Sequence, residues 1–207
     1  MAKIAVLTGD LVNSTQVTSP KAFRLRLQSL LEAVGNAYGG KAVTFRGDGF
    51  QVSLNDPRKA IECALYIRAG LIASSPAKSD RWDARISVAI ARAATNEDSY
   101  GDAYIQSGRN LDDMARDNLH VYAEPQAFKI GVALATVFVD DIIGGWTPSE
   151  AEAYFAYLQY PQGHQAVAEH LKKSRSTITK SLIRAKYSLI NRYLEDTLTL
   201  MEITHAV

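Results

Sequence analysis

The segment between Ala42 and Leu54 constrains the fold of this chain more than any other feature. Two short runs, at residues 42–45 and 50–54, alternate apolar and polar positions on either side of Gly47-Asp48-Gly49. An Asp-Gly pair between alternating runs is a strong signal for a β-hairpin. We therefore expect two neighbouring antiparallel strands with Asp48 at the tip of their turn.

The surrounding segments predict more strands and helices. Residues 3–7 form an apolar run that predicts a buried strand, ended by Gly9-Asp10, and residues 81–91 alternate as a further strand does. Apolar residues at helical spacing predict helices at 20–38, 57–74 and 102–115, and residues 119–122 predict a fifth strand. The whole pattern predicts an α+β fold, a ferredoxin-like antiparallel sheet with helices on one face.

The C-terminal part of the chain predicts helices alone. The composition changes near residue 125, and Gly144-Gly145 interrupts an apolar helix, so we expect two domains, at 1–144 and 145–207. Thr147-Pro148-Ser149-Glu150 has the residues of a helix start, with Thr147 as the N-cap. A short helix at 165–171, a turn at 172–174 and one long helix from Ser176 predict a helix-turn-helix.

Composition and charge narrow the classes of function. The net charge of +1 is too small for the whole molecule to bind nucleic acid or membrane through its overall charge. Cys63 is the single cysteine and cannot form an internal disulfide, and the start of the chain has no signal-peptide pattern. No apolar run reaches the ~20 residues that cross a bilayer. We expect a cytoplasmic protein without a membrane partner.

Two aspartates are the candidate metal ligands. Asp10 and Asp48 lie at the ends of predicted strands, and if these strands are neighbours the two carboxylates can share Mg²⁺ or Mn²⁺. The ion commonly completes its shell with substrate phosphates. Candidate phosphate contacts come from the loop after Asp10 and from two arginines: Leu11, Asn13, Ser14, Thr15, Arg46 and Arg109. The alternative is that both aspartates are ordinary turn residues.

Three segments resemble the motif blocks of class III nucleotidyl cyclase catalytic domains. They are Asp10-Leu11 with Ser14-Thr15, then Gly47-Asp48-Gly49-Phe50, then Ser107-Gly108-Arg109-Asn110-Leu111, in the family's order over roughly residues 3 to 123. The resemblance implies that Asp10 and Asp48 bind two metal ions and that the substrate is a nucleoside triphosphate. It further implies that Arg109 stabilises the charge that develops on the phosphate, across a head-to-tail homodimer.

The chain departs from that family at two positions. Thr44 stands where the family has its purine-reading lysine, and Ile105 stands where it has an asparagine that acts in the transition state. The N-terminal stretch is also similar to SatD-type bacterial proteins, which have no settled activity. The resemblance therefore reaches further for the fold than for catalysis.

The C-terminal helices carry a local excess of positive charge. Seven Lys or Arg residues and no acidic residue lie between His170 and Leu194. The segment resembles the DNA-binding region of sigma factors, in which the second helix lies in the major groove. The candidate DNA contacts are Lys172, Lys173, Arg175, Ser176, Thr177, Thr179, Lys180 and Arg184. The alternative is a solvated face of an ordinary helical bundle.

Three functions follow from these features. The first is a transcription regulator that responds to a nucleotide and binds duplex DNA as a homodimer. The second is an active nucleotidyl cyclase that makes a cyclic nucleotide with two metal ions. The third is a degenerate cyclase-like fold that only joins two DNA-binding parts.

Overall fold

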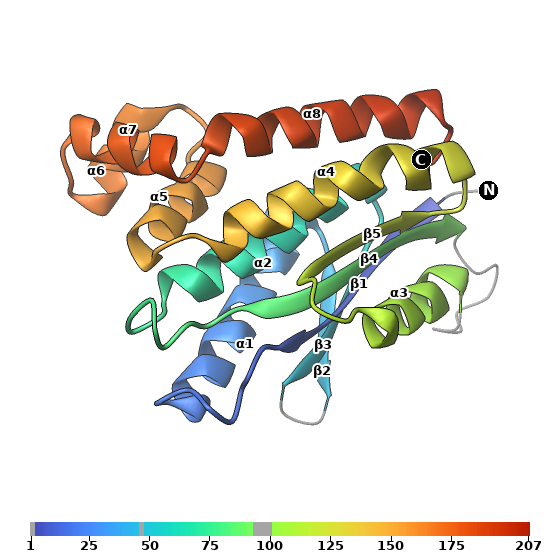
Figure 1. The fold of residues 1–207 in the computed structure, drawn as a ribbon, viewed down its shortest axis with the longest axis horizontal. Coiled ribbons are helices and arrows are strands. Elements are labelled where there is room, and N and C mark those ends of the chain that lie inside the picture. Colours follow the sequence, from blue (N-terminus) through green and yellow to red (C-terminus); the bar gives the residue numbers. More distant parts are fainter. Residues whose placement is uncertain (1–2, 46–47, 93–100) are drawn as a thin grey trace.

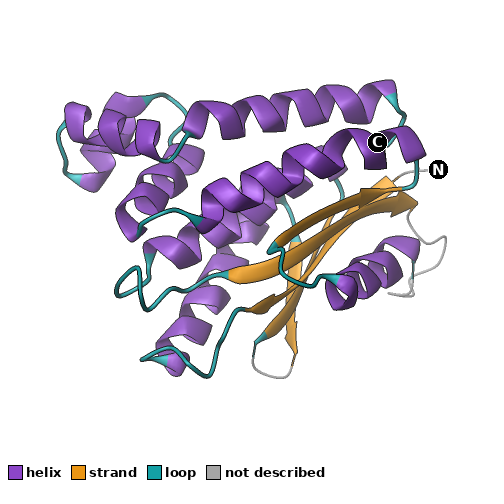
Figure 2. Ribbon diagram, in the orientation of Figure 1, coloured by secondary structure: helices purple, strands orange, loops and turns teal. Residues whose placement is uncertain are grey.

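The computed structural model describes residues 3–45, 48–92 and 101–207. Figures 1 and 2 show a mixed α+β fold in which a twisted sheet is flanked by helices. The strands are β1 (Lys3–Leu11), β2 (Lys41–Phe45), β3 (Gly49–Leu54), β4 (Ala84–Arg92) and β5 (Leu119–Ala123). The helices are α1 (Pro20–Tyr38), the 3₁₀ helix η1 (Pro57–Lys59), α2 (Ala60–Ala73), α3 (Asp102–Asp113), α4 (Gln126–Gly144), α5 (Pro148–Gln159), α6 (His164–Leu171), α7 (Arg175–Arg184) and α8 (Tyr187–Ile203).

The sheet has the order β2-β3-β1-β4-β5. The predicted hairpin is present, because β2 and β3 are antiparallel neighbours, and β1 is antiparallel to both β3 and β4. The prediction of a wholly antiparallel sheet is wrong at its edge, where β4 and β5 are parallel. A crossover through α3 joins these two strands, and such a connection returns the chain in the same direction.

Helices cover both faces of the sheet. Ala5 and Leu7 of β1 belong to the large core that also contains residues of α1, α2 and α4. The side chain of Val6 points to the opposite face of the sheet, where it packs with Ala91 of β4 and Ala103 of α3. The prediction that all helices lie on one face is therefore wrong for α3, which Figure 1 shows on the opposite side of the sheet from α2 and α4.

The C-terminal helices pack on the helices that cover the sheet. Helix α5 contacts α2, and α8 contacts α4. Trp146, Tyr154 and Ile190 are buried in the same apolar cluster as the residues of the sheet. The predicted boundary at residues 144 and 145 falls where α4 ends, and the division into two domains stays a prediction. None of the described helices is long and apolar enough to span a membrane.

The long helix predicted from Ser176 is two helices. Helix α7 ends at Arg184, and Lys186 takes a left-handed conformation, with φ of 58°, before α8 begins. The carbonyl oxygen of Ala185 accepts a hydrogen bond from the indole of Trp146 at 2.9 Å. Leu189, in the first turn of α8, is 56% exposed, because the break rotates the chain that follows.

Candidate functional site

Asp10 lies at the end of a strand, as predicted, one residue before β1 ends. Across the sheet it lies opposite Arg85 of β4. Arg85 donates hydrogen bonds from Nε and Nη2 to the two carboxylate oxygens of Asp10, at 2.9 and 2.6 Å. The two side chains are about one-third exposed. Asp10 is thus held by a bidentate ion pair at the surface of the sheet.

Asp48 comes to the same end of the sheet from the β2–β3 turn. It precedes Gly49, which lies opposite Asp10 in the β1–β3 ladder. The carboxylate of Asp48 accepts a hydrogen bond from the hydroxyl of Ser14 at 2.8 Å, and its backbone carbonyl accepts one from the N–H of Leu11 at 3.3 Å. The β2–β3 turn and the loop after β1 therefore meet at the end of the sheet that carries the Asp10–Arg85 pair.

Arg85 is a candidate functional residue that the sequence reasoning missed. Its hydrogen bonds to Asp10 and the nearby acidic charge raise the pKa of its guanidinium further above the ordinary arginine value. It also donates to the backbone carbonyl of Met114, just after α3, at 3.2 Å. The sequence marks Arg85 only as a basic residue at a polar position of an alternating strand. Such a position by itself indicates exposure to solvent and no particular function.

Part of the backbone of the loop after β1 forms hydrogen bonds with other segments of the protein. The side chain of Leu11 is buried in the core, and the N–H of Val12 donates to the carbonyl of Asp83 at 3.0 Å. Asn13 has a left-handed conformation, with φ of 49°, and Ser14 is buried against Asp48. Thr15 is exposed. This loop contacts Asp48 through Leu11 and Ser14, and its role in binding phosphate stays a prediction.

Thr44 and Arg109 form no hydrogen bond or ion pair with these aspartates in the described part of the chain. Thr44 lies on the opposite face of the sheet, in a groove that Gln28 and Glu32 of α1 also line. Arg109 is exposed on α3, on the side of the sheet that Asp10 faces. Arg46 falls outside the described residues. A role for Arg109 across a dimer stays a prediction.

The donor atoms at this end of the sheet are all oxygens, which is the atom type that a hard divalent cation prefers. They are carboxylate oxygens from Asp10 and Asp48 and the hydroxyl of Ser14, which are ligand types that Mg²⁺ and Mn²⁺ prefer. In the described part of the chain, no three His, Cys, Asp or Glu side chains lie close enough together to hold a metal ion. An ion at Asp10 would therefore replace the guanidinium of Arg85 and draw further ligands from a bound molecule.

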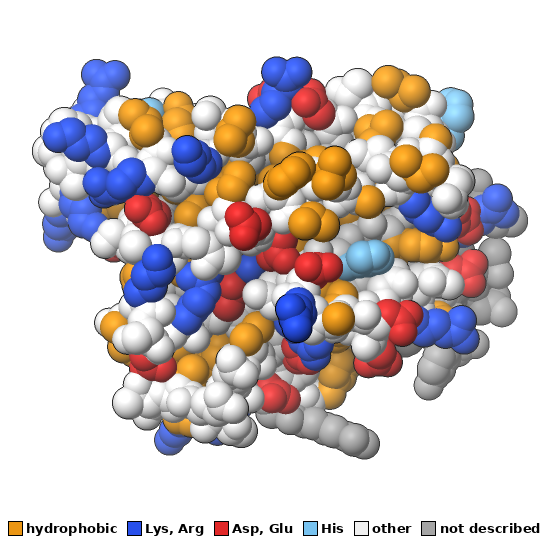
Figure 3. All heavy atoms as spheres, viewed as in Figure 1, with side chains coloured by type: hydrophobic (Ala, Val, Ile, Leu, Met, Phe, Trp, Pro, Cys, Tyr) orange, Lys and Arg blue, Asp and Glu red, His pale blue; other side chains and the backbone are white. Residues whose placement is uncertain are grey.

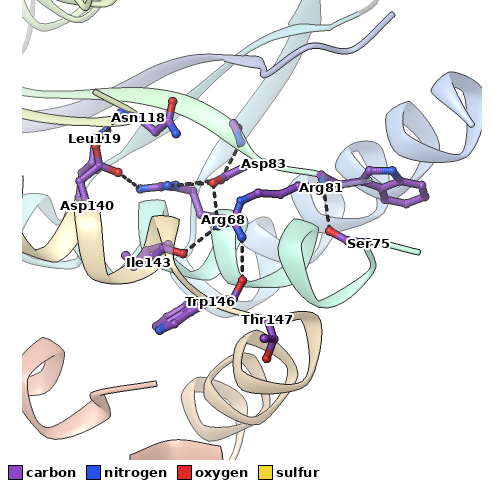
Figure 4. Close-up of polar contacts among 12 residues, drawn as sticks. Arg68, Ser75, Arg81, Asp83, Asn118, Leu119, Asp140, Ile143, Trp146 and Thr147 are labelled. Carbon is purple, nitrogen blue, oxygen red and sulfur yellow. Dashed lines mark hydrogen bonds and ion pairs between the residues drawn. The ribbon is translucent and has the colours of Figure 1, made fainter. Parts of the chain in front are cut away.

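A buried charge network begins at the loop of the candidate site (Figure 4). Asp83, whose carbonyl accepts from Val12, receives two hydrogen bonds of 2.9 Å from Arg68. Arg68 also donates to Asp140 of α4 at 2.6 Å, and no part of its side chain is exposed. Arg81 joins Asp83 to the backbone carbonyls of Ile143 and Trp146. The network therefore connects α2 and the segment just before β4 with the end of α4.

The same contacts lead on to the end of α7. The indole of Trp146 donates to the carbonyl of Ala185, which follows the last residue of α7. Hydrogen bonds through Asp83, Arg81 and Trp146 thus join the loop after β1 to Ala185, the residue after α7.

Helix α6, the turn at residues 172–174 and the start of α7 lie close to where they were predicted, whereas α7 is shorter than the predicted second helix. Ser174 caps α7 by accepting a hydrogen bond from the N–H of Thr177, and Ile178 and Leu182 face inward. Figure 3 shows Lys and Arg side chains gathered over this end of the molecule. Lys172, Arg175 and Lys180 are exposed there.

Several of the predicted DNA contacts have partners within the protein. Lys173 pairs with Glu152 of α5, and Arg184 pairs with Glu150 at 3.3 Å. The hydroxyl of Thr179 lies 3.0 Å from Nδ1 of His164. The hydroxyls of Ser176 and Thr177 lie 3.0 and 2.8 Å from that of Ser174.

Comparison with solved structures finds adenylyl and guanylyl cyclases. A bacterial light-regulated adenylyl cyclase matches with a TM-score of 0.44 and 16% identity, over 58% of this chain and 43% of that chain. An adenylate/guanylate cyclase/hydrolase from Silicibacter pomeroyi gives 0.45 and 20%, over 57% and 74% of the two chains. The guanylate cyclase domain of RhGC from Catenaria anguillulae, in complex with GTP, gives 0.43 and 17%, over 58% and 78%.

The likeness concerns the fold, and it covers little more than half of the chain. This chain spans less than half the length of the light-regulated cyclase. No protein-family model and no curated protein matches it.

Proposed function

We propose that this chain is a DNA-binding regulator whose α+β portion binds a nucleoside triphosphate together with a divalent metal ion. The observation that carries the DNA-binding part is the outward face of α7. Arg175, Ser176, Thr177 and Lys180 are exposed at its amino end, while Ile178 and Leu182 are buried behind them. Basic and hydroxyl side chains on the outer face of the second helix suit contacts with DNA phosphates and base edges.

Fluorescence anisotropy of a labelled duplex tests DNA binding by the full chain. We expect binding at low salt that weakens steeply as salt is added. The double substitution Arg175→Ala/Lys180→Ala should weaken binding by about tenfold or more, because each side chain contributes a charge or a base contact. The control substitution Lys21→Ala/Arg24→Ala on α1 removes the same amount of charge and should change the DNA affinity far less. The absence of binding at low salt would refute this part of the proposal.

The nucleotide part rests on the Asp10–Arg85 pair and on Asp48. A divalent ion held by the two carboxylates would neutralise phosphate charge, which is the chemistry that such an ion supplies. Release of Asp10 frees the guanidinium of Arg85, whose planar donors match phosphate oxygens. Asn13, Ser14 and Thr15 would line the same phosphates. Arg85→Lys should weaken triphosphate binding by about tenfold, since lysine lacks the bidentate geometry.

A second function, nucleotide cyclisation, is favoured by one observation. Arg109 is exposed on the side of the sheet that Asp10 faces, so it is free to contact a nucleotide held by another copy. Incubation with each nucleoside triphosphate and Mg²⁺ or Mn²⁺ separates the two functions. Cyclic nucleotide and pyrophosphate that disappear in Asp48→Ala would support the cyclase. Binding without product would support the regulator.

We propose that the network of Figure 4 couples triphosphate binding at the sheet to DNA binding at α7. Trp146→Phe removes the indole hydrogen bond to Ala185, and it should reduce the effect of the triphosphate on DNA affinity while leaving triphosphate affinity unchanged. Trp82→Phe is the matched control, because the indole nitrogen of Trp82 is buried without a hydrogen-bond partner among the described residues. Equal behaviour of the two variants would count against this route.

A further inference from the structure

The exposed side of α4 carries a row of large apolar side chains. Ile130, Leu134, Val137 and Phe138 are 69, 66, 48 and 61% exposed, and we call these four residues the α4 stripe. Their spacing puts them on one side of the helix. Figure 3 shows hydrophobic side chains in the middle of this view, where Figure 1 places α4.

The α4 stripe is unlike the solvated face of a neighbouring helix. No charged residue lies between Lys129 and Asp140, whereas the exposed positions of α8 include Arg192, Glu195 and Asp196. Solvent-facing sides of helices ordinarily carry charged and polar residues. The stripe exposes an apolar area on the order of 500 Å², at the upper end of what a monomer ordinarily leaves uncovered.

We propose that the α4 stripe is a homodimer interface, in which two copies of α4 cross antiparallel about a two-fold axis near Leu134. Two stripes placed face to face bury roughly 1,000 Å², the lower limit for a specific interface, before flanking residues are added. Leu189 and Ile203 of α8, which are 56 and 71% exposed, are apolar side chains on the adjacent helix.

The charges at the two ends of the α4 stripe support an antiparallel pairing with a second copy. Lys129 precedes the stripe and Asp141 follows it, about 18 Å apart at the helical rise. A two-fold axis near Leu134 therefore places Lys129 level with Asp141 of the partner subunit along the helix axis, and the same holds at the other end. A parallel pairing would place like charges together.

A membrane surface fits the α4 stripe less well. Helices that lie in the membrane interface are rich in Lys and Arg on their polar face. Lys129 is the one basic residue in the 19 positions of α4, and its ammonium lies over the ring of Tyr122, 4.6 Å from the centroid. The absence of flanking positive charge favours a protein partner.

This dimer differs from the head-to-tail pairing implied by the cyclase resemblance, because it uses α4 and leaves Asp10 and Asp48 outside the interface. It requires neither nucleotide nor DNA. On the proposed DNA-binding function, it would also supply two α6–α7 pairs for paired half-sites. A failure of the dimer would therefore leave the test of DNA binding by a single chain intact.

Sedimentation equilibrium of the full chain without nucleotide tests the interface. We expect a dimer at micromolar concentration, and Leu134→Glu or Phe138→Glu should weaken association by about 100-fold or more. Leu25→Glu is the matched control, since Leu25 is 56% exposed on α1. A monomeric native chain, or a dimer that tolerates both charges on the stripe, would overturn the proposal. So would a monomeric chain that pellets with anionic lipid vesicles through the same residues.

A cysteine cross-link tests the geometry. Leu134→Cys lies near the proposed axis, so mild oxidation should join two subunits, whereas Leu25→Cys should not. The native Cys63 is buried, and burial raises the pKa of its thiol, so it should not contribute. If Leu25→Cys cross-links as readily as Leu134→Cys, the antiparallel crossing is wrong.

Discussion

At the scale of single residues, Gly9 sets the distance between the strands that hold the candidate site. A Cβ atom at Gly9 would lie 2.6 Å from the carbonyl oxygen of Arg85 and 2.6 Å from the ring of Phe50. Neither neighbour is a flexible chain end, so β1 and β4 approach closely enough for the Asp10–Arg85 pair only because the position lacks a side chain.

We expect Gly9→Ala to destabilise the fold by about 1–3 kcal/mol, because the methyl group must displace β4 or Phe50. Denaturant unfolding measures the change. Gly108→Ala is the control, since a Cβ there meets nothing within 4 Å. Alanine inside α3 should stabilise by about 0.5–1 kcal/mol. Similar losses in both variants would contradict the packing argument.

At the scale of helices and strands, local signals were read correctly where they act within a few residues. The hairpin follows from its turn, and the start of α5 follows from Thr147 and Glu150, which form a capping box. The side of the sheet covered by α3 was not predictable, because it depends on the small contacts of Val6, Ala91 and Ala103. The break at Lys186 also lacks a glycine that would have marked it.

In the candidate site, too, the residues in local patterns could be predicted, and those that depend on strand pairing could not. Asp10, Asp48 and Ser14 occur in local patterns, and the β1–β3 pairing brings them together. Arg85 could not be assigned, because its role depends on the register of β1 with β4. The face on which Thr44 lies is set in the same way, by the pairing of β2 with β3.

The capping box gives a prediction for α5. Glu150 donates its N–H to Thr147 at 3.3 Å and accepts from the N–H of Thr147 at 2.8 Å. Thr147→Ala should therefore lower the free energy of unfolding by about 1 kcal/mol. Thr199→Ala, at an exposed position of α8, should be close to neutral. Thermal unfolding of the two variants compares them, and an unchanged Thr147→Ala would mean that tertiary contacts alone hold α5 in place.

At the scale of the molecule, Arg68 balances two buried carboxylates that come from different layers. Burial alone would raise the pKa of Asp83, and the charge and hydrogen bonds of Arg68 more than offset this, so the pKa lies below its ordinary value. The stability from this carboxylate is present above its unfolded pKa of about 4 and is lost as the pH falls through the folded value.

Arg68→Met should reverse that dependence. Asp83 and Asp140 would remain buried without their partner, at a cost of about 3–5 kcal/mol near neutral pH. Because burial then raises the pKa of Asp83, protonation should restore part of this loss as the pH is lowered toward 5. Urea unfolding across this range measures it. Arg58→Met, at an exposed ion pair, should cost far less, with little pH dependence.

The separation of these charges along the chain has a consequence for biosynthesis. Arg68 and Asp83 are 15 positions apart, but Asp140 follows Arg68 by 72 positions. A nascent polypeptide therefore makes the first half of the ion cluster several seconds before the ribosome adds the last carboxylate, at typical elongation rates. Until then Arg68 lacks the carboxylate of Asp140. The buried ion cluster can therefore form in full only after α4 has been translated.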